Sequence, residues 1–320
     1  MKLLFRTITA LTPLADIPSF VLDEPYFYIH KTAVADTGFG SDNQAVLIDG
    51  GFGLYSCVNL RDEIGPLKSN VYRVALCLRG SVDVHIGLEK FTHEPNSIHF
   101  HTPNQLFWLR NKSADLDAYY LVFTSDFIDE LLTDSQLAAA YPFFDYQQVP
   151  FFRLAQNEAD AIKALLLDIS DEVLNHWPDR SRRIKLLLNL IFITAKRSYS
   201  RQRISPGSAS VSHSPLVTRY KKLVGQQYVT RRSVKEYADI LAVSVSHLHK
   251  MVKDETGRSP GELIDDMLLM ELRALLRYTD LRMSEIAYQL RFTDTSHLAK
   301  FFRKAMGASP STYRRKHRLG

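Results

Sequence analysis

Hydrophobic and polar residues alternate over much of residues 20–125, and Gly, Pro, Asn or Asp ends most of the short runs. A period of two is typical of strands that bury one face. The predicted strands are AVLIDG, VYRVALCLRG, SVDVHIG, SIHFHTP, QLFWLR and AYYLVFT. Because no helical pattern separates these runs, they predict a β-barrel or a β-sandwich.

Between residues 157 and 196 the hydrophobic period becomes that of a helix. Two stripes of apolar residues stand on either side of the sequence HWPD, and they consist of Ala161, Leu165, Leu166 and Ile169, then Ile184, Leu187, Leu188, Ile191 and Phe192. The second helix is apolar over an unusually wide arc. Packing against the predicted barrel and a dimer interface both explain that arc, and the pattern leaves both open.

The stretch YSRQRISPGSASVSHSP lacks apolar periodicity and is rich in Ser, Arg, Gly and Pro, which predicts a flexible linker over residues 199–214. The charge changes sign at the same place. Residues 1–212 contain 20 Lys and Arg against 24 Asp and Glu, whereas residues 213–320 contain 20 against 11. A small basic module favours a polyanion as its partner, although a solvated basic surface would look the same.

Two stretches of the basic module repeat one pattern. EYADILAVSVSHLHKMVKDETGRSP covers residues 236–260, and EIAYQLRFTDTSHLAKFFRKAMGASP covers residues 285–310. The matching letters are 49 positions apart at first and 50 after one inserted residue. So many matches at one spacing indicate an internal duplication. Each copy predicts a helix, a tight turn and a second helix, which is the arrangement that places the second helix in a DNA major groove.

The helix boundaries follow from capping signals. In the first copy we predict a helix over residues 234–241 and a second one that Ser244 caps. In the second copy we predict that Ser284 caps the first helix and that Thr293 or Asp294 caps the second. Gly257 and Gly307 end the second helices. We call these second helices the reading helices.

One amphipathic helix is predicted between the copies, from near residue 260 to near residue 277. At about 1.5 Å per residue it spans roughly 25–27 Å. Such a spacer can hold two reading helices about one duplex turn, ~34 Å, apart on one side of DNA.

Residues 216–315 resemble the AraC/XylS-type transcription regulators. The resemblance rests on the two repeated units, on ELRALLRYTDLRMSEIA and on the closing FFRKAMGASPSTYRR. This sequence departs from the family at Arg291, where the second turn usually has glycine. A side chain there is expected to strain the turn, to shift its conformation or to add a phosphate contact, and the sequence leaves these alternatives open. The resemblance implies double-stranded DNA and RNA polymerase as partners, activation of transcription, a homodimer formed through the N-terminal region, and a cupin-like barrel before the helices.

The resemblance also assigns DNA contacts. The positions that match base contacts in the family form one face of each reading helix, and they are Ser246, His249, Lys250, Thr295, Ser296, Ala299 and Lys300. Lysine suits the acceptors of guanine, and Ala299 suits a thymine methyl group. The candidates for phosphate contacts are Lys253, Arg291, Thr293, Arg303, Lys304, Arg314 and Arg315. Because His249 in the first copy aligns with Ala299 in the second copy, we expect the two reading helices to prefer different half-sites.

An enzyme is the alternative from another class. His99 and His101 are two apart on a predicted strand and therefore share a face, which suits two metal ligands. The cupin metal pattern also needs a nearby carboxylate, and none follows before Asp115. We therefore predict no metal, no cofactor and no catalytic residues, with a metal-dependent cupin enzyme fused to a DNA-binding domain as the runner-up.

A barrel interior can also bind a small organic effector. The candidate pocket residues are Phe52, Tyr72, His85, His99 and Phe107. A barrel filled by its own side chains, which serves only for dimerisation, is an equally good interpretation. The sequence does not name a ligand.

The cellular location follows from what the composition lacks. Arg6 interrupts the apolar start, no apolar run approaches the ~20 residues of a membrane span, and only two cysteines are present. We therefore expect a cytoplasmic, nucleoid-associated protein without a membrane partner.

The full prediction is an α+β protein in four segments. A cupin-like sensor or dimerisation barrel occupies residues 1–155, a helical pair 156–198, a linker 199–214, and an all-α domain with two helix-turn-helix units 215–320. The predicted function is sequence-specific regulation of transcription.

Overall fold

The computed structural model describes residues 29–30, 38–41, 47–48, 51–128, 133–145, 150–204 and 214–318. Most of the predicted strand AVLIDG and residues 205–213 of the predicted linker lie outside these ranges. The strands are β1 (Phe52–Ser56), β2 (Ile64–Leu67), β3 (Tyr72–Arg79), β4 (Val82–Ile86), β5 (Glu89–His93), β6 (Ser97–His101), β7 (Phe107–Arg110), β8 (Asp117–Phe123) and β9 (Phe151–Arg153).

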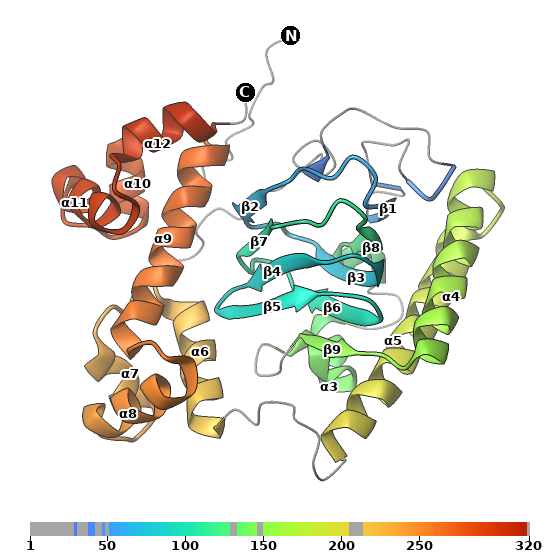
Figure 1. Ribbon diagram of the computed structural model, residues 1–320, viewed down its shortest axis with the longest axis horizontal. Coiled ribbons are helices and arrows are strands. Elements are labelled where there is room, and N and C mark those ends of the chain that lie inside the picture. Colours follow the sequence, from blue (N-terminus) through green and yellow to red (C-terminus); the bar gives the residue numbers. More distant parts are fainter. Residues whose placement is uncertain are drawn as a thin grey trace.

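Most of the helices follow β8 in the chain, and β9 lies between the short helices and α4 (Figure 1). Those beside the sheets are α2 (Ser125–Ile128), α3 (Asp134–Ala140), the short 3-10 helix η1 (Pro142–Phe144), α4 (Gln156–Asn175) and α5 (Arg180–Ile204). Those of the C-terminal part are α6 (Pro215–Gln227), α7 (Val234–Ile240), α8 (Val245–Thr256), α9 (Pro260–Tyr278), α10 (Met283–Gln289), α11 (Thr295–Met306) and α12 (Pro310–His317).

The described strands form two antiparallel sheets. One has the order β1-β8-β3-β6-β9, and the other has the order β2-β7-β4-β5. The prediction of a cupin-like, β-rich N-terminal part is confirmed, and among the described strands no ladder of hydrogen bonds joins one sheet to the other, so the barrel is open. The result is a cupin-like pair of facing sheets.

Alternation along β3 assigns its side chains to two different layers. Tyr72, Val74 and Leu76 join the core beneath the helices, whereas Ala75 joins the core between the sheets. Successive side chains of a strand point to opposite faces, so the residue between two helix-facing positions must face the other sheet. Arg73 obeys this rule and is buried between the sheets.

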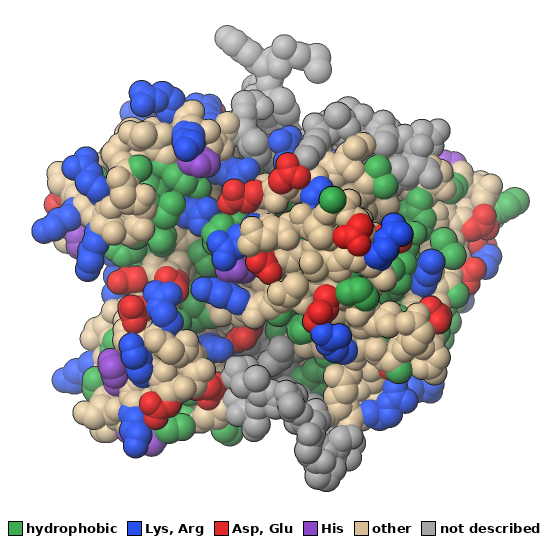
Figure 2. Space-filling model, in the orientation of Figure 1, with side chains coloured by type: hydrophobic (Ala, Val, Ile, Leu, Met, Phe, Trp, Pro, Cys, Tyr) green, Lys and Arg blue, Asp and Glu red, His purple; other side chains and the backbone are tan. Residues whose placement is uncertain are grey.

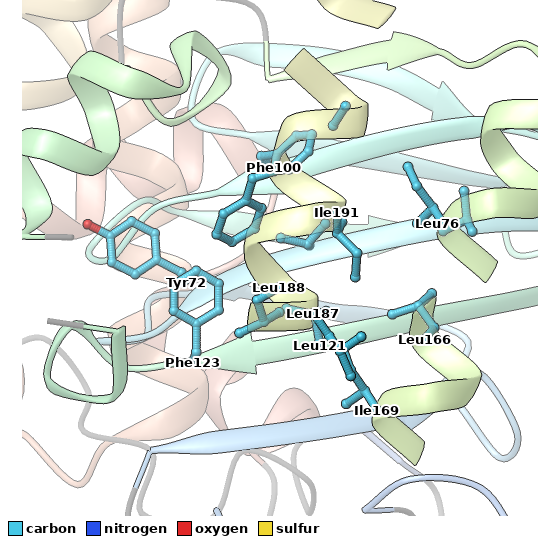
Figure 3. Close-up of a cluster of buried hydrophobic side chains, with 14 of the residues drawn as sticks. Tyr72, Leu76, Phe100, Leu121, Phe123, Leu166, Ile169, Leu187, Leu188 and Ile191 are labelled. Carbon is cyan, nitrogen blue, oxygen red and sulfur yellow. The ribbon is translucent and has the colours of Figure 1, made fainter. Parts of the chain in front are cut away.

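Helices α4 and α5 cover the outer face of the five-stranded sheet. Figure 3 shows Leu166 and Ile169 of α4 and Leu188 of α5 pointing towards strand residues such as Leu121. Burial of each such side chain stabilises the fold by about 1.5–3 kcal/mol. The wide apolar arc of α5 therefore packs against the sheet.

The same pair of helices keeps apolar residues on its outer side. Leu167, Leu186 and Leu190 are 47%, 51% and 49% exposed. The N-terminal end of α5 follows the HWPD turn as predicted, but the helix continues to Ile204, so residues 199–204 are not part of a linker. Tyr199 explains the extension, because its buried side chain packs in the core beneath the helices.

The C-terminal helices bury their own core around α9. Leu272, Leu275 and Leu276 of α9 are fully buried among side chains of α6 to α12. α9 contacts β2, so the helical part lies against the edge of the four-stranded sheet (Figure 1). No helix among the described residues is both long and apolar enough to cross a membrane.

Candidate nucleic-acid interface

The first helix-turn-helix unit consists of α7 and α8. Ser244 caps α8 as predicted, and its hydroxyl accepts a 3.1 Å hydrogen bond from the His247 N–H. Leu248 and Val252 are fully buried and fasten the inner side of α8 to the domain core. Gly257 then ends the helix with a φ of +69°, a conformation that costs other residues more than glycine.

The second unit, α10 and α11, begins differently from the prediction. Ser284 does not cap α10, because Arg282 precedes the helix and donates its backbone N–H to the Glu285 carboxylate at 2.6 Å. Asp294 caps α11 by accepting a 2.7 Å hydrogen bond from the His297 N–H. That backbone hydrogen bond lowers the pKa of the Asp294 carboxyl. The charged cap also suits the positive end of the helix dipole.

The two turns have the same backbone conformation. Ala242 and Arg291 occupy equivalent positions 49 residues apart, with φ values of +55° and +52°. Arg291 therefore does not shift the second turn, although a side chain in this left-handed region costs on the order of 1 kcal/mol. The caps Ser244 and Asp294 are 50 residues apart, which places the extra residue of the second copy at Thr293.

The predicted base-reading faces are accessible. Ser246, His249 and Lys250 are exposed on α8. On α11 the corresponding set is exposed except for Ala299, which is half-buried, and it consists of Thr295, Ser296, Ala299 and Lys300. Each face lies opposite the side that enters the domain core, so either helix can enter a groove without unpacking.

Most of the predicted phosphate contacts are also exposed, and these are Lys253, Arg291, Thr293, Arg303, Lys304 and Arg315. Arg314 differs, because its guanidinium is half-buried and donates a 2.7 Å hydrogen bond to the Leu281 carbonyl. Burial lowers the pKa of Arg314. The Thr293 hydroxyl lies 3.1 Å from the His297 ring, so this side chain is already engaged beside the cap of α11.

The length of α9 separates the two units. Its 19 residues correspond to roughly 28 Å at about 1.5 Å per residue. Figure 1 shows one unit at each end of α9, both outside the sheets. Lys and Arg side chains gather over these units in Figure 2, which is the charge that a phosphate backbone attracts.

Sequence reasoning missed a polar junction between α9 and the sheets. The Lys68 ammonium lies 2.6 Å from the Glu271 carboxylate, and both side chains are almost completely buried. The Tyr228 hydroxyl donates to Glu271 at 2.9 Å and accepts from Lys68 at 2.8 Å. The available signal was the presence of charged residues such as Glu271 on an otherwise apolar helix.

Three further contacts at the same helix belong to this junction. Arg277 donates to the Gly65 carbonyl at 2.8 Å, while the Gly65 N–H donates to the Tyr278 hydroxyl at 3.1 Å. The Arg273 guanidinium lies 4.2 Å from the Trp108 ring centroid. The helix that spaces the reading helices is thus also the helix that docks on the sheets.

The predicted pocket residues do not lie together. His99 and Phe107 line a cavity of about 30 Å³ between the sheets. Phe52 and Tyr72 instead belong to the core beneath α4 and α5. His85 stacks edge-on against Trp108, with ring centroids 5.0 Å apart, and burial lowers its pKa to about 4. These five residues come from five different strands, and the layer that each side chain enters depends on which face of its strand points to the other sheet.

No group of three or more His, Cys, Asp or Glu side chains in the described part of the chain is arranged to hold a metal ion. His99 and His101 do share the face predicted for them, and the His93 and His99 ring centroids are 4.5 Å apart. Burial, the largest cause, lowers the pKa of His93 and of His101 to about 3. These rings are therefore neutral near pH 7.

Comparisons with known proteins point to the C-terminal part. Residues 237–316 match the model of a helix-turn-helix domain. The transcriptional activator RhaS of Enterobacter sp. (strain 638) is 35% identical over 77 residues, which cover 24% of this chain and 28% of RhaS. The chain thus matches less than a third of the length of this relative.

Solved structures with the same likeness include the C-terminal domain of AraT, a response regulator from Geobacillus stearothermophilus. The matched region is 29% identical in sequence and includes 34% of this chain and 91% of the AraT domain, with a TM-score of 0.33. ToxT from Vibrio cholerae is 16% identical over 84% of this chain and 100% of that chain, with a TM-score of 0.40. The matched family model and the two capped units together show that residues 237–316 form a helix-turn-helix domain, which is similar to that of the transcriptional activator RhaS.

Proposed function

We propose that this protein is a one-component transcription regulator, an activator that binds double-stranded DNA through α8 and α11 in successive major grooves. The observation that carries the proposal is the pair of exposed reading faces at the two ends of α9. We assign residues 215–320 to DNA binding, 1–155 to effector sensing or dimerisation, and 156–198 to the helical pair between them. The expected location is the cytoplasm, at the nucleoid.

Sequence specificity would come from the reading faces, and affinity largely from phosphate contacts. The Lys250 and Lys300 ammonium groups are exposed on their helices and suit guanine O6 and N7. Because His249 and Ala299 differ in size and polarity at equivalent positions, each half-site would differ and the target would be directional. Contact with RNA polymerase would follow from binding beside a promoter.

A homodimer would form through α4 and α5. Leu167, Leu186 and Leu190 lie on the outer side of this pair and are about half exposed. Figure 2 shows hydrophobic side chains along this side of the molecule. A second copy of the chain would bury them, and it would also double the number of reading helices on a promoter.

The experiment is selection of binding sites from random DNA with the full chain, followed by affinity measurements on the selected site. Lys250→Ala and Lys300→Ala should each weaken specific binding by roughly 5- to 150-fold, corresponding to about 1–3 kcal/mol per base contact, and relax only their own half-site. Arg303→Ala serves as the matched control, because loss of a phosphate contact weakens all sequences alike and reduces the salt slope by about one. Unchanged sequence preference in both lysine variants would contradict the assignment of the reading faces.

A further inference from the structure

Arg73 places a positive charge between the two sheets. It is the second residue of β3 and is 3% exposed. Its guanidinium carbon lies 4.5 Å from the ring centroid of Phe107 and 5.6 Å from that of Tyr120, which are cation–π contacts. None of its three guanidinium nitrogens has a hydrogen-bond partner among the described residues. An arginine stays protonated in proteins, so this charge is buried without a counter-ion there.

Other unsatisfied polar atoms surround the same space. The cavity of about 30 Å³ is lined by Arg73, His93 and His99 together with apolar side chains, and no Asp or Glu of the described ranges lines it. Both ring nitrogens of His99 and the Nε2 atom of His93 lack hydrogen-bond partners among described residues. Burial, with a smaller contribution from Arg73, keeps the pKa of His99 well below its ordinary value. A neutral imidazole still offers one N–H donor.

A buried cation that lacks an anion is costly by several kcal/mol, and native proteins rarely tolerate it without a partner. The guanidinium fork matches the two oxygens of a carboxylate, and an adjacent N–H of His99 can donate to either oxygen. We propose that this cavity binds the carboxylate group of a small organic acid, with Arg73 as the charge partner and His99 as an additional donor.

The cavity limits the size of that acid. A cavity that admits benzene has about 150 Å³, so a cavity of about 30 Å³ accommodates a carboxylate with at most a short hydrocarbon part. Apolar neighbours such as Leu109 and Val82 favour acetate over a strongly hydrated inorganic anion. Longer acids would have to displace these side chains.

The position of the cavity deepens the proposed function, on which its regulatory role rests. Phe107 and Leu109 of β7 line the cavity, and Trp108 between them points to the other face of the strand. The Trp108 indole donates to the Glu63 carboxylate at 3.1 Å and stacks under Arg273 of α9. A bound carboxylate would thus lie on one face of β7, while α9, the helix that spaces the reading helices, contacts Trp108 on the other face.

The test is thermal unfolding of the full chain in sodium acetate, with sodium chloride at equal ionic strength and neutral acetamide as comparison solutes. Acetate should raise the midpoint of wild type in a saturating manner, and acetamide and chloride should not. The effect should disappear in Arg73→Met. It should persist in the matched control Arg79→Met, because Arg79 lies on the same strand but is exposed. Carbon-13 NMR of labelled acetate with wild-type protein measures binding without any variant.

The outcomes are separable. Without acetate, Arg73→Met should unfold at least as high as wild type, since it removes an unpaired buried charge. Absence of acetate binding to wild type, equal stabilisation by chloride, or retained acetate binding in Arg73→Met would overturn the carboxylate site. Acetate binding without any change in DNA affinity would leave the site intact and refute its role as effector. If the wild-type protein does not bind DNA in a sequence-specific manner, only the proposed function is refuted, and the carboxylate site is unaffected.

Discussion

The ion pair between Lys68 and Glu271 should decide whether the helical domain stays docked on the sheets. Lys68 follows β2, and Glu271 lies in α9, so the pair joins the two parts of the molecule. Lys68→Met removes the positive partner with little change in side-chain length. We expect it to weaken docking strongly, because the Glu271 carboxylate then stays buried without a positive partner among the described residues and keeps the hydrogen bond from the Tyr228 hydroxyl.

The magnitude follows from the geometry. At 2.6 Å and an effective dielectric constant of about 20, two unit charges attract by roughly 6 kcal/mol. Desolvation of the two ions offsets several kcal/mol of this attraction, but removal of one partner leaves that desolvation uncompensated. The expected loss is about 3–5 kcal/mol, which corresponds to a change on the order of 10²- to 10⁴-fold in the docking equilibrium.

Hydrogen exchange at β2 measures the docking directly. The Gly65 N–H donates to the Tyr278 hydroxyl only while α9 is docked, so its exchange should accelerate strongly in Lys68→Met. Lys112→Met is the control, because Lys112 pairs at 3.5 Å with Asp62, which is 76% exposed, and such pairs contribute about 0–1 kcal/mol. The double variant Lys68→Met/Glu271→Leu should restore protection, since an apolar pair can replace a buried ion pair. Unchanged exchange in Lys68→Met, or no recovery in the double variant, would refute this reasoning.

Three further predictions concern strain, pH and assembly. Arg291→Gly should raise the free energy of unfolding, measured by urea denaturation, by about 1 kcal/mol because it relieves a positive φ. Arg303→Gly, within α11, is the control and should lower the free energy of unfolding by a similar amount. Equal effects of the two substitutions would contradict the assignment of strain to Arg291. From pH 7 to pH 5.5, the free energy of unfolding should fall by about 1 kcal/mol for each of His93 and His101. The reason is that their pKa values are about 3 in the folded protein and 6.5 in the unfolded chain, so the unfolded chain binds protons first. Equal stability in urea denaturation at the two pH values would argue against neutral buried rings. Leu190→Asp should shift sedimentation equilibrium towards monomer, and an undisturbed dimer would exclude the outer side of α5 as its interface.

Docking of α9 has a consequence for regulation. The helix that sets the distance between α8 and α11 is also held by Lys68, Gly65 and Trp108. A change in the sheets that alters these contacts therefore acts on both reading helices together. Under the proposed function, this arrangement would couple the cavity to DNA binding without a contact between the cavity and either reading helix.

Local signals in the sequence were sufficient for the helix-turn-helix units. The repeated pattern, the Ser244 cap and the glycines Gly257 and Gly307 each act within one or two helical turns, so their outcome depends little on distant residues. The error at Ser284 has the same local origin, because Glu285 pairs with the backbone of Arg282 and starts the helix earlier.

Tertiary structure decided the layers of the N-terminal part. Period-two alternation identified strands, but the layer that each face meets depends on which strands pair and on where α4 and α5 pack. Phe52 and Tyr72 therefore entered the helix-covered core, while His99 and Phe107 faced the cavity. Whether the predicted barrel or sandwich closes was also left to the tertiary structure, since closure depends on ladders between strands far apart in the chain.

What the sequence determined by itself was the repeated reading unit, its spacer helix and the charge of the basic module, because periodicity, capping and composition are properties of neighbouring residues. Only the tertiary structure brought Lys68 to Glu271 across 203 positions and buried Arg73 between the sheets beside His99. These contacts join residues that lie far apart in the chain. Burial makes the electrostatic interactions of their charges strong, whereas solvent would screen the same charges at the surface.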